Sequence, residues 1–377
     1  MKPIEVEGIS TDDISVIIQG AFDQKTTLES IRLLRKVLPG AKLILSTWEN
    51  SKLPDSIELN VDEIVLSSDP GAVLSDETNR IFYNYNRQLI STKSGLAKAK
   101  TKFSLKIRTD MLIKDVNFLS HFFSFPKREK KFSVFKERLI VSSMFTRHRF
   151  IDEKREYNKP ILHISDWGFF GLTEDMNLYF NNAELVAEPH FSTYFKNQCD
   201  DTEVVRCYST MTCRFPPEQQ LAISSFSKFF PILNSLKDYA EKRDDLVKLS
   251  DNIILHNFII LDPHSWPLIV NKPDYLQRSK DISKFSIFEF KTLYREHIFR
   301  KEYAKYTRNQ KREWDRVLIR HNLRFKIIIS FIVSKFNCFE ESRLFYYHGK
   351  KTLYFLWLIL KEASYGNFQK LYGNKNE

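Results

Sequence analysis

Short apolar runs that alternate with helical segments fill the first 110 residues, and this alternation constrains the fold more than any other feature. The apolar runs are the length of buried strands, and the segments between them place apolar residues at every third or fourth position. Such alternation predicts an α/β fold with a mostly parallel central sheet and helices on both faces. The pattern predicts strands at 14–18, 41–46, 62–66 and 103–107, and helices at 27–37 and 85–100.

The chain of 377 residues, 42% of them hydrophobic, is long enough for one large α/β domain with an appendage. After residue 119 the pattern is less regular, and the clearest strand-like stretches are 134–143 and 161–171. We expect the acceptor-side half of the same catalytic domain there. Few turn residues follow residue 286, so helices are expected. The predicted domains are a catalytic domain over 1–280 and a helical extension over 281–377.

The net charge of +11 is concentrated at the end of the chain. Residues 295–377 hold 18 Lys and Arg against 8 Asp and Glu, whereas the remainder holds 40 against 39. Two apolar stretches with basic ends, 320–336 and 350–361, are too short to span a bilayer. They fit helices lying on an anionic membrane surface, with helices packed on the catalytic domain as the alternative.

Cellular location is indicated by two weaker signals. The first ten residues carry three charges and no apolar run, which is not the pattern of a secretory signal. The four cysteines lack zinc-ligand spacing and are read as reduced thiols. We therefore expect a protein on the cytoplasmic face of the inner membrane, with no nucleic acid as partner.

Polar residues follow the predicted parallel strands, where open α/β sheets bind their ligands. Asp110 comes directly after the strand at 103–107, where a carboxylate can hold a divalent cation, Mn²⁺ or Mg²⁺, against two phosphates. Its alternative role is to cap the next turn. Arg87 can contact donor phosphates or lie on a solvated helix face. The expected donor-binding residues are Gln19, Gly20, Trp48, Glu49, Asp69, Arg87, Arg108 and Asp110.

Two carboxylates in the second half are candidates for the general base on an acceptor hydroxyl. Asp166 stands beside Trp167, an aromatic platform for a sugar, although a turn Asp next to a core Trp is equally typical. Glu218 follows two prolines in the first turn of a predicted helix, where capping alone also favours a carboxylate. His256 and His264 can complete a cation shell with Asp110, or be packed or surface histidines.

Taken together, eight segments resemble the WavE lipopolysaccharide synthesis family over roughly residues 12–265. The order and number of the segments carry this resemblance, and the basic tail lies outside it. The segments are IIQG (17–20), LPGAKLILSTWE (38–49), IVLSSDPG (64–71), NRQLIST (86–92), KFSLKIRTDM (102–111), FKERLIVSSMFTR (135–147), ISDWGFFGLTEDM (164–176) and PEQ (217–219).

The resemblance implies a bacterial glycosyltransferase with the GT-A nucleotide-diphospho-sugar transferase fold. Its donor would be a nucleotide sugar, and its acceptor a lipid-linked or oligosaccharide lipopolysaccharide, O-antigen or capsule glycan. Many GT-A enzymes end this strand in Asp-x-Asp, whereas this chain has Arg108-Thr109-Asp110, so Arg108 can instead meet the diphosphate directly. The rival functions are a non-catalytic basic adaptor for nucleic acid or acidic polysaccharide, and a nucleotidyl or sugar-phosphate transferase.

Overall fold

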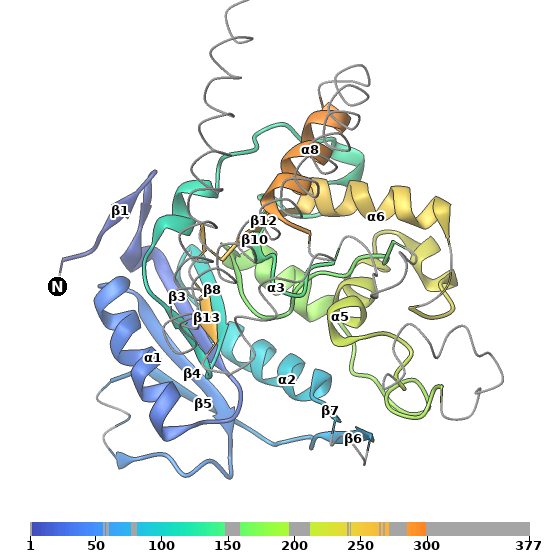
Figure 1. Ribbon diagram of the computed structural model, residues 1–377. Helices are drawn as coiled ribbons and strands as arrows, with labels where there is room; N and C mark the ends of the chain where they lie inside the picture. The colour runs from blue at the N-terminus through green and yellow to red at the C-terminus, as the bar shows by residue number, and fades with distance from the viewer. Residues whose placement is uncertain are drawn as a thin grey trace, which may run out of the picture. The chain divides into compact units, whose positions relative to one another are not determined.

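A computed structural model gives the fold (Figure 1). Contacts divide the chain into two units, Met1–Lys301 and Glu302–Glu377, and the account below concerns the first. The structure describes residues 2–55, 57, 60–76, 81–147, 159–195, 212–239, 241, 243–263, 265–266, 268–270 and 285–298.

A seven-stranded sheet with the order β12-β10-β11-β8-β3-β4-β5 forms the centre of this unit. Neighbouring strands pair in parallel except at β11, which runs against both β10 and β8. The sheet is therefore mostly parallel, as the sequence pattern predicts. The strands are β3 (Ile14–Gln19), β4 (Lys42–Trp48), β5 (Glu63–Ser67), β8 (Phe103–Arg108), β10 (Leu139–Ser142), β11 (Phe169–Leu172) and β12 (Phe258–Leu261).

Helices cover both faces of the sheet, each over its own buried apolar cluster (Figure 1). On one face, α1 buries Ile31 and Leu34 against the strand residues that point to that side. On the other face, α2 and α3 bury Leu89 and Phe180 in the second cluster. The described helices are α1 (Gln24–Val37), α2 (Tyr85–Leu96), α3 (Thr173–Asn182), α5 (Pro217–Phe226), α6 (Asp244–Asn257) and α8 (Ile287–Ile298).

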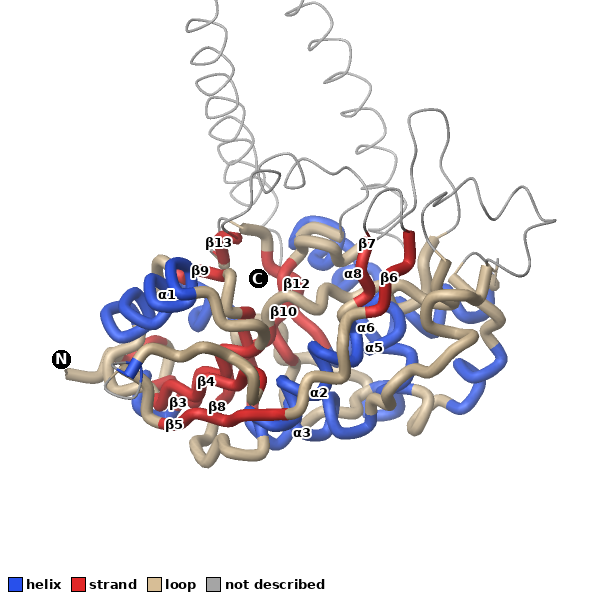
Figure 2. Tube along the Cα trace, turned by 90° about the horizontal axis from the view of Figure 1, so that it is seen from below, coloured by secondary structure: helices blue, strands red, loops and turns tan. Residues whose placement is uncertain are grey.

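Three strand pairs lie outside the central sheet, and one of them joins distant parts of the chain. Residues 111–113 pair with residues 268–270, next to α1, where Figure 2 shows both strands. These pairs are β1 (Glu5–Val6) with β2 (Ile9–Ser10), β6 (Val73–Asp76) with β7 (Ile81–Tyr83), and β9 (Met111–Ile113) with β13 (Leu268–Val270).

The sequence prediction is confirmed for the first 110 residues, where each expected strand and helix is present. It is less accurate beyond them. The stretch at 134–143 contains a strand only over β10, and the stretch at 161–171 becomes extended only at β11. Helix α8 starts where the change in composition predicts helices, and it packs on α6 and β12 within the first unit. The two basic tail segments lie outside the described residues.

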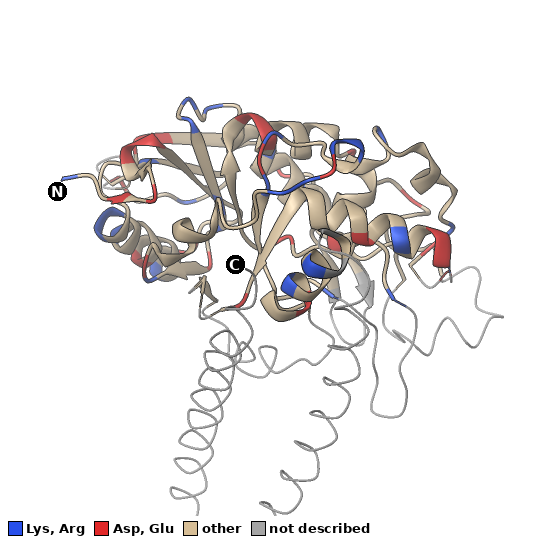
Figure 3. Ribbon diagram, turned by 90° about the horizontal axis from the view of Figure 1, so that it is seen from above, with Lys and Arg blue, Asp and Glu red and all other residues tan. Residues whose placement is uncertain are grey.

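Charge is mixed on the described part of the first unit. Figure 3 shows Lys and Arg side by side with Asp and Glu on its helices and loops. Among the described helices, none is long and apolar enough to cross a membrane.

Candidate active site

The strand order reverses between β3 and β8, and the candidate site lies at this point. From β3 the chain crosses one face of the sheet through α1 to reach β4, whereas α2 crosses the other face to reach β8. Ligands of open α/β sheets bind beyond the carboxyl ends of the strands at such a reversal. Here the last residue of β3, Gln19, pairs with Arg108, the last residue of β8.

The loops after β3 and β8 are bonded tightly to each other. The Thr109 main-chain N–H donates to the Gln19 carbonyl oxygen at 3.0 Å, and the Thr109 hydroxyl donates to the Ala21 carbonyl oxygen at 2.7 Å. Gly20 lies between these contacts with φ +122°, and a Cβ there would be 3.3 Å from the Thr109 hydroxyl oxygen. Glycine fits because this backbone conformation disfavours any side chain.

An arginine and an aspartate form a bidentate ion pair at the end of β8. Arg108 donates from Nε to Asp110 Oδ1 at 2.9 Å and from a terminal nitrogen to Oδ2 at 2.5 Å. The centre of the guanidinium lies 5.3 Å from the centroid of the Trp167 ring, in cation–π contact. Both members of the pair keep about a quarter of their side-chain surface exposed. The pair is therefore accessible at the switch point.

A second bidentate pair joins Arg87 of α2 to Asp69, in the loop after β5. Arg87 Nε and a terminal nitrogen donate to the two Asp69 oxygens at 2.6 and 2.5 Å, and Gly71 N–H donates to Asp69 Oδ1 at 2.9 Å. The hydrogen bond from Arg87 holds the pKa of the Asp69 carboxyl below its ordinary value. Asp69 is thus ionised at neutral pH and fixes the direction of Arg87.

The other expected donor residues differ in accessibility. Gln19 is only 2% exposed, and its side-chain oxygen accepts a hydrogen bond from the Ser91 hydroxyl at 2.6 Å. Trp48 is buried at the end of β4, whereas the neighbouring Glu49 is exposed. Gln19 and Trp48 therefore support the edge of the sheet from within, and Glu49 is the one of the three that meets solvent.

Asp166 reaches the same edge because β11 is antiparallel. Residues that precede β11 lie where the neighbouring parallel strands end, and Trp167 accordingly contacts Arg108. Asp166 is 8% exposed, and its buried Oδ1 has no hydrogen-bond partner among the described residues. An unsatisfied buried carboxylate oxygen is costly, and such atoms cluster at functional sites.

Glu218 completes the site from the first turn of α5. Part of Glu218 is exposed, yet protein surrounds its carboxyl closely enough that burial raises the pKa to about 8, and the negative charge of Asp166 adds to this rise. The positive charges of Arg147 and Arg108 act in the opposite direction. The structure therefore brings both candidate carboxylates together, within electrostatic reach of the arginine after β8.

Comparison with known protein families decides the affiliation of the chain. The model of the family described as WavE lipopolysaccharide synthesis matches residues 14–324, more than four-fifths of the sequence. The chain belongs to the WavE family. The comparison with curated proteins gave no match. The family description gives this WavE protein a role of the glycosyltransferase type in lipopolysaccharide synthesis.

Two side chains of the WavE protein that contact Asp166 were not predicted from the sequence. Lys106 lies fully buried in β8 and donates to the Asp166 main-chain carbonyl oxygen. Gln88 of α2 donates to the same oxygen at 2.6 Å. The one available signal was a lysine inside an apolar strand, FSLKI, where a charged residue is rarely buried. Gln88 gave no signal, because its partner is 78 positions away.

Of the expected cation ligands, the structure describes Asp110 and His256, and these two lie apart. His256 lies in the last turn of α6, which leads directly into β12. Because β12 runs parallel to β8, His256 lies at the edge of the sheet opposite Asp110. Its Nδ1 is 2.8 Å from the Asn252 carbonyl oxygen, and burial lowers its pKa. His264 lies outside the described residues. Within the described residues, no three His, Cys, Asp or Glu side chains form a group that could hold a metal ion.

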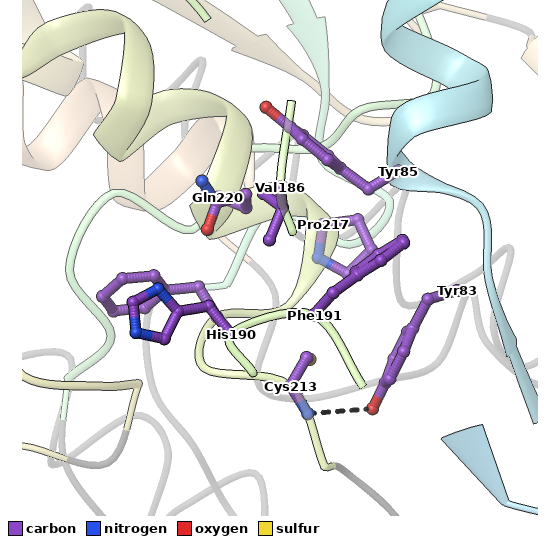
Figure 4. A pocket seen from close by; sticks show the side chains of 9 residues that line it. Tyr83, Tyr85, Val186, His190, Phe191, Cys213, Pro217 and Gln220 are labelled. Carbon is purple, nitrogen blue, oxygen red and sulfur yellow. Dashed lines mark hydrogen bonds between the residues drawn. The ribbon is translucent and has the colours of Figure 1, made fainter. Parts of the chain in front are cut away.

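A small cavity at the start of α5 is lined largely by aromatic rings (Figure 4). Pro217 and Gln220 of α5 form one wall, and Tyr83, whose hydroxyl accepts from Cys213 N–H at 3.4 Å, forms another. The cavity has room for about one water molecule. It is therefore too small for a sugar ring.

Proposed function

We propose that this WavE protein is a glycosyltransferase that moves a sugar from a nucleotide-diphospho-sugar to a lipopolysaccharide, O-antigen or capsule glycan. The observation that carries the proposal is the pair of carboxylates, Asp166 and Glu218, beside Arg108 at the switch point of the sheet. Acceptor activation needs a carboxylate, and the leaving diphosphate needs positive charge. A mixed α/β sheet of this order is compatible with the GT-A fold.

The donor half of the site is formed by the loops after β3, β4, β5 and β8. Arg108 is placed to bind the diphosphate, because a guanidinium matches phosphate oxygens in a bidentate manner and its position is fixed by Asp110 and Trp167. Arg87, fixed by Asp69, supplies a second positive charge. Gly20 lets the donor approach the main chain, and Glu49 offers a carboxylate at the rim.

A divalent cation fits the donor half through Asp110 alone. Mn²⁺ and Mg²⁺ bind one or two protein carboxylates together with water and substrate phosphates, so a single accessible carboxylate is sufficient. When bound, the cation would neutralise charge on the leaving diphosphate. His256 has no part in this proposal, since it lies at the opposite edge of the sheet.

The acceptor half of the site supplies the group that takes the proton of the acceptor hydroxyl. In a single displacement, the acceptor hydroxyl oxygen bonds to the anomeric carbon as the bond from that carbon to the diphosphate oxygen breaks, and the hydroxyl proton passes to a carboxylate. Burial and the neighbouring negative charge of Asp166 raise the pKa of Glu218 to about 8, so this carboxyl is protonated at neutral pH. A protonated carboxyl cannot take the proton, so we assign Asp166 as the general base, while Glu218 holds an acceptor hydroxyl by hydrogen bonding.

The acceptor of such an enzyme is carried on a lipid, and the basic tail provides a means to reach it. Residues 295–377 carry a charge of +10 from 18 basic and 8 acidic residues. We propose that the two segments with basic ends bind the anionic surface of the inner membrane on its cytoplasmic face. Loss of binding to anionic liposomes after deletion of residues 320–377 would support this, and unchanged binding would contradict it.

The donor assignment is tested by nucleotide release from a panel of UDP-, GDP-, CMP- and dTDP-sugars, with Mn²⁺ or Mg²⁺ and with EDTA. We expect cation-dependent release of a nucleoside diphosphate from one donor, reduced on the order of 100-fold by Asp110→Asn. Release of pyrophosphate, or of a nucleoside monophosphate from a nucleotide-diphospho-sugar, would instead indicate nucleotidyl or sugar-phosphate transfer.

The chain offers a matched control for Asp110→Asn. Asp245 forms the same bidentate contact with an arginine two positions earlier, Arg243, at 2.9 and 2.8 Å, but at the start of α6. Asp245→Asn should leave turnover unchanged. Equal losses in both variants, or no turnover of any donor in the presence of candidate acceptors, would refute the donor site.

A further inference from the structure

The main-chain carbonyl of Asp166 is held by two side chains from two different elements. Lys106 Nζ donates to this oxygen from the middle of β8, and Gln88 Nε2 donates to it at 2.6 Å from the second turn of α2. We call this arrangement the two-donor contact. It ties Asp166 both to the strand that ends in Arg108 and to the helix that carries Arg87.

The segment around Asp166 depends on such contacts for its position. Residues 161–168 form no helix or strand, so no regular ladder of main-chain hydrogen bonds holds them. Next to Asp166, Ser165 N–H donates to the Thr146 hydroxyl at 2.9 Å, and Trp167 N–H donates to the Ser165 hydroxyl at 3.3 Å. Earlier in the segment, single contacts to the rest of the protein include Leu162 N–H to the Ser250 hydroxyl at 2.9 Å. The Asp166 carbonyl oxygen differs from these in accepting from two side chains at once.

The cost of burying Lys106 argues against a purely structural purpose. The ammonium group is removed from water in the centre of the sheet, and burial lowers its pKa to about 7 despite the nearby charges of Asp166 and Asp110, with Arg108 lowering it further. An apolar side chain of similar length fills the same space at no such cost. What the lysine supplies, and an apolar side chain cannot, is an amine donor directed at the Asp166 main-chain carbonyl oxygen.

We infer that Lys106 and Gln88 are positioning residues for the proposed sugar transfer, and that their two-donor contact fixes the Asp166 carboxylate and the Trp167 ring over the end of β8. The inference rests on the proposed function for its catalytic consequence. The placement of Asp166 and Trp167 can be measured separately, without any assay of sugar transfer.

The kinetic test uses the full chain with Gln88→Leu, Lys106→Met and the double variant. We expect each single variant to lower kcat about 10- to 100-fold, since small misplacements of reacting groups have effects of this size. The affinity for the nucleoside diphosphate should stay within about twofold of the wild type, because neither side chain is among the proposed phosphate-binding groups. The double variant should lose little more than the worse single variant, since both donors act on one oxygen. Lys106→Arg should recover part of the loss.

Lys93 provides the matched control. It lies on α2, like Gln88, and its Nζ donates to the Ala183 main-chain carbonyl oxygen at 2.7 Å, away from the site. Lys93→Met removes the same kind of contact and should leave kcat unchanged.

The spectroscopic test follows quenching of Trp167 emission by acrylamide, with Trp167→Phe used to isolate its contribution. Increased quenching in Gln88→Leu and Lys106→Met, but not in Lys93→Met, would support the two-donor contact. This result would hold even if the wild type transferred no sugar. Failure of the wild type to transfer sugar would refute only the proposed function. Wild-type transfer with unchanged kcat in Gln88→Leu and Lys106→Met would overturn the inference, as would unchanged quenching in both variants.

Discussion

Replacing Glu218 with glutamine should stabilise the protein in a pH-dependent way while it lowers the rate of transfer. The folded state raises the pKa of Glu218 from an ordinary 4.5 to about 8, mainly through burial. Between these values the folded state binds more protons than the unfolded state, so stability from this group is fully present below pH 4.5 and is lost as pH rises through 8. Glutamine carries no charge at any of these pH values, so the variant escapes this loss.

The expected size of the effect follows from the same contacts. A pKa raised from 4.5 to about 8 corresponds to at most about 5 kcal/mol in the free energy of unfolding. Because part of Glu218 meets solvent, we halve this value, and removal of a carboxylate from the first turn of α5 costs about 0.5 kcal/mol. The variant should thus gain about 1 to 2 kcal/mol at pH 8.5, which raises the Tm by roughly 1.5 to 3 °C.

Thermal unfolding of wild type and Glu218→Gln at pH 5, 7 and 8.5 measures this gain. Glu174→Gln is the control, since Glu174 also lies in the first turn of a helix, α3, but is half exposed and paired with Lys136. The control should lose slightly in Tm at each pH and retain transfer. A Tm difference for Glu218→Gln that is the same at pH 5 and pH 8.5, or negative at pH 8.5, would refute the placement of this carboxyl beside Asp166.

Three further predictions concern the donor half and the strand beneath it. The free energy of unfolding of Lys106→Met should exceed that of the wild type by most below pH 7, because the cost of burying the ammonium group is full there and disappears above pH 10.5. Denaturant unfolding across this pH range measures the difference between the two proteins. A difference that does not change with pH would contradict the burial of Lys106. Asp69→Asn should weaken nucleotide affinity about tenfold by calorimetry, since Arg87 loses its bidentate partner, and unchanged affinity would remove Arg87 from the site. Gly20→Ala should lower stability by about 1 to 3 kcal/mol, and by more than Gly8→Ala, whose φ is also positive but whose Cβ would meet open space; equal losses would refute the crowding at Thr109.

The first half of the fold could be predicted from sequence because its signals are local. The strand at β3 is a short, mostly apolar run, and α1 has apolar residues on one face and ends at Val37, just before Pro39-Gly40. The second half gave weaker signals. Residues 161–168 are buried without being extended, and the apolar side chains among them, such as Ile161, Leu162 and Ile164, indicated a strand where tertiary contacts hold an irregular segment.

The sequence indicates a position at the carboxyl edge of the sheet most directly where a residue follows a strand end. Asp110 and Asp69 satisfy this rule, and the structure adds that each is paired with an arginine. Which carboxylates meet in space is a different question, since Asp166 and Glu218 are 52 positions apart. His256 was proposed as a cation ligand from residue type alone, and only the strand order shows that it lies at the far edge of the sheet.

The single reversed strand explains why the two halves of the site face each other. If β11 ran parallel to β8, residues 166 and 167 would lie at the amino edge of the sheet, away from Arg108. Because β11 is antiparallel, its preceding loop delivers Asp166 and Trp167 to the carboxyl edge, and the chain then continues through α3 to the first turn of α5, where Glu218 meets Asp166. A substitution that disturbs the turn into β11 should therefore separate the acceptor carboxylates from Arg108 while the parallel strands β3, β4, β5 and β8 keep the donor half intact, so transfer is lost before donor binding.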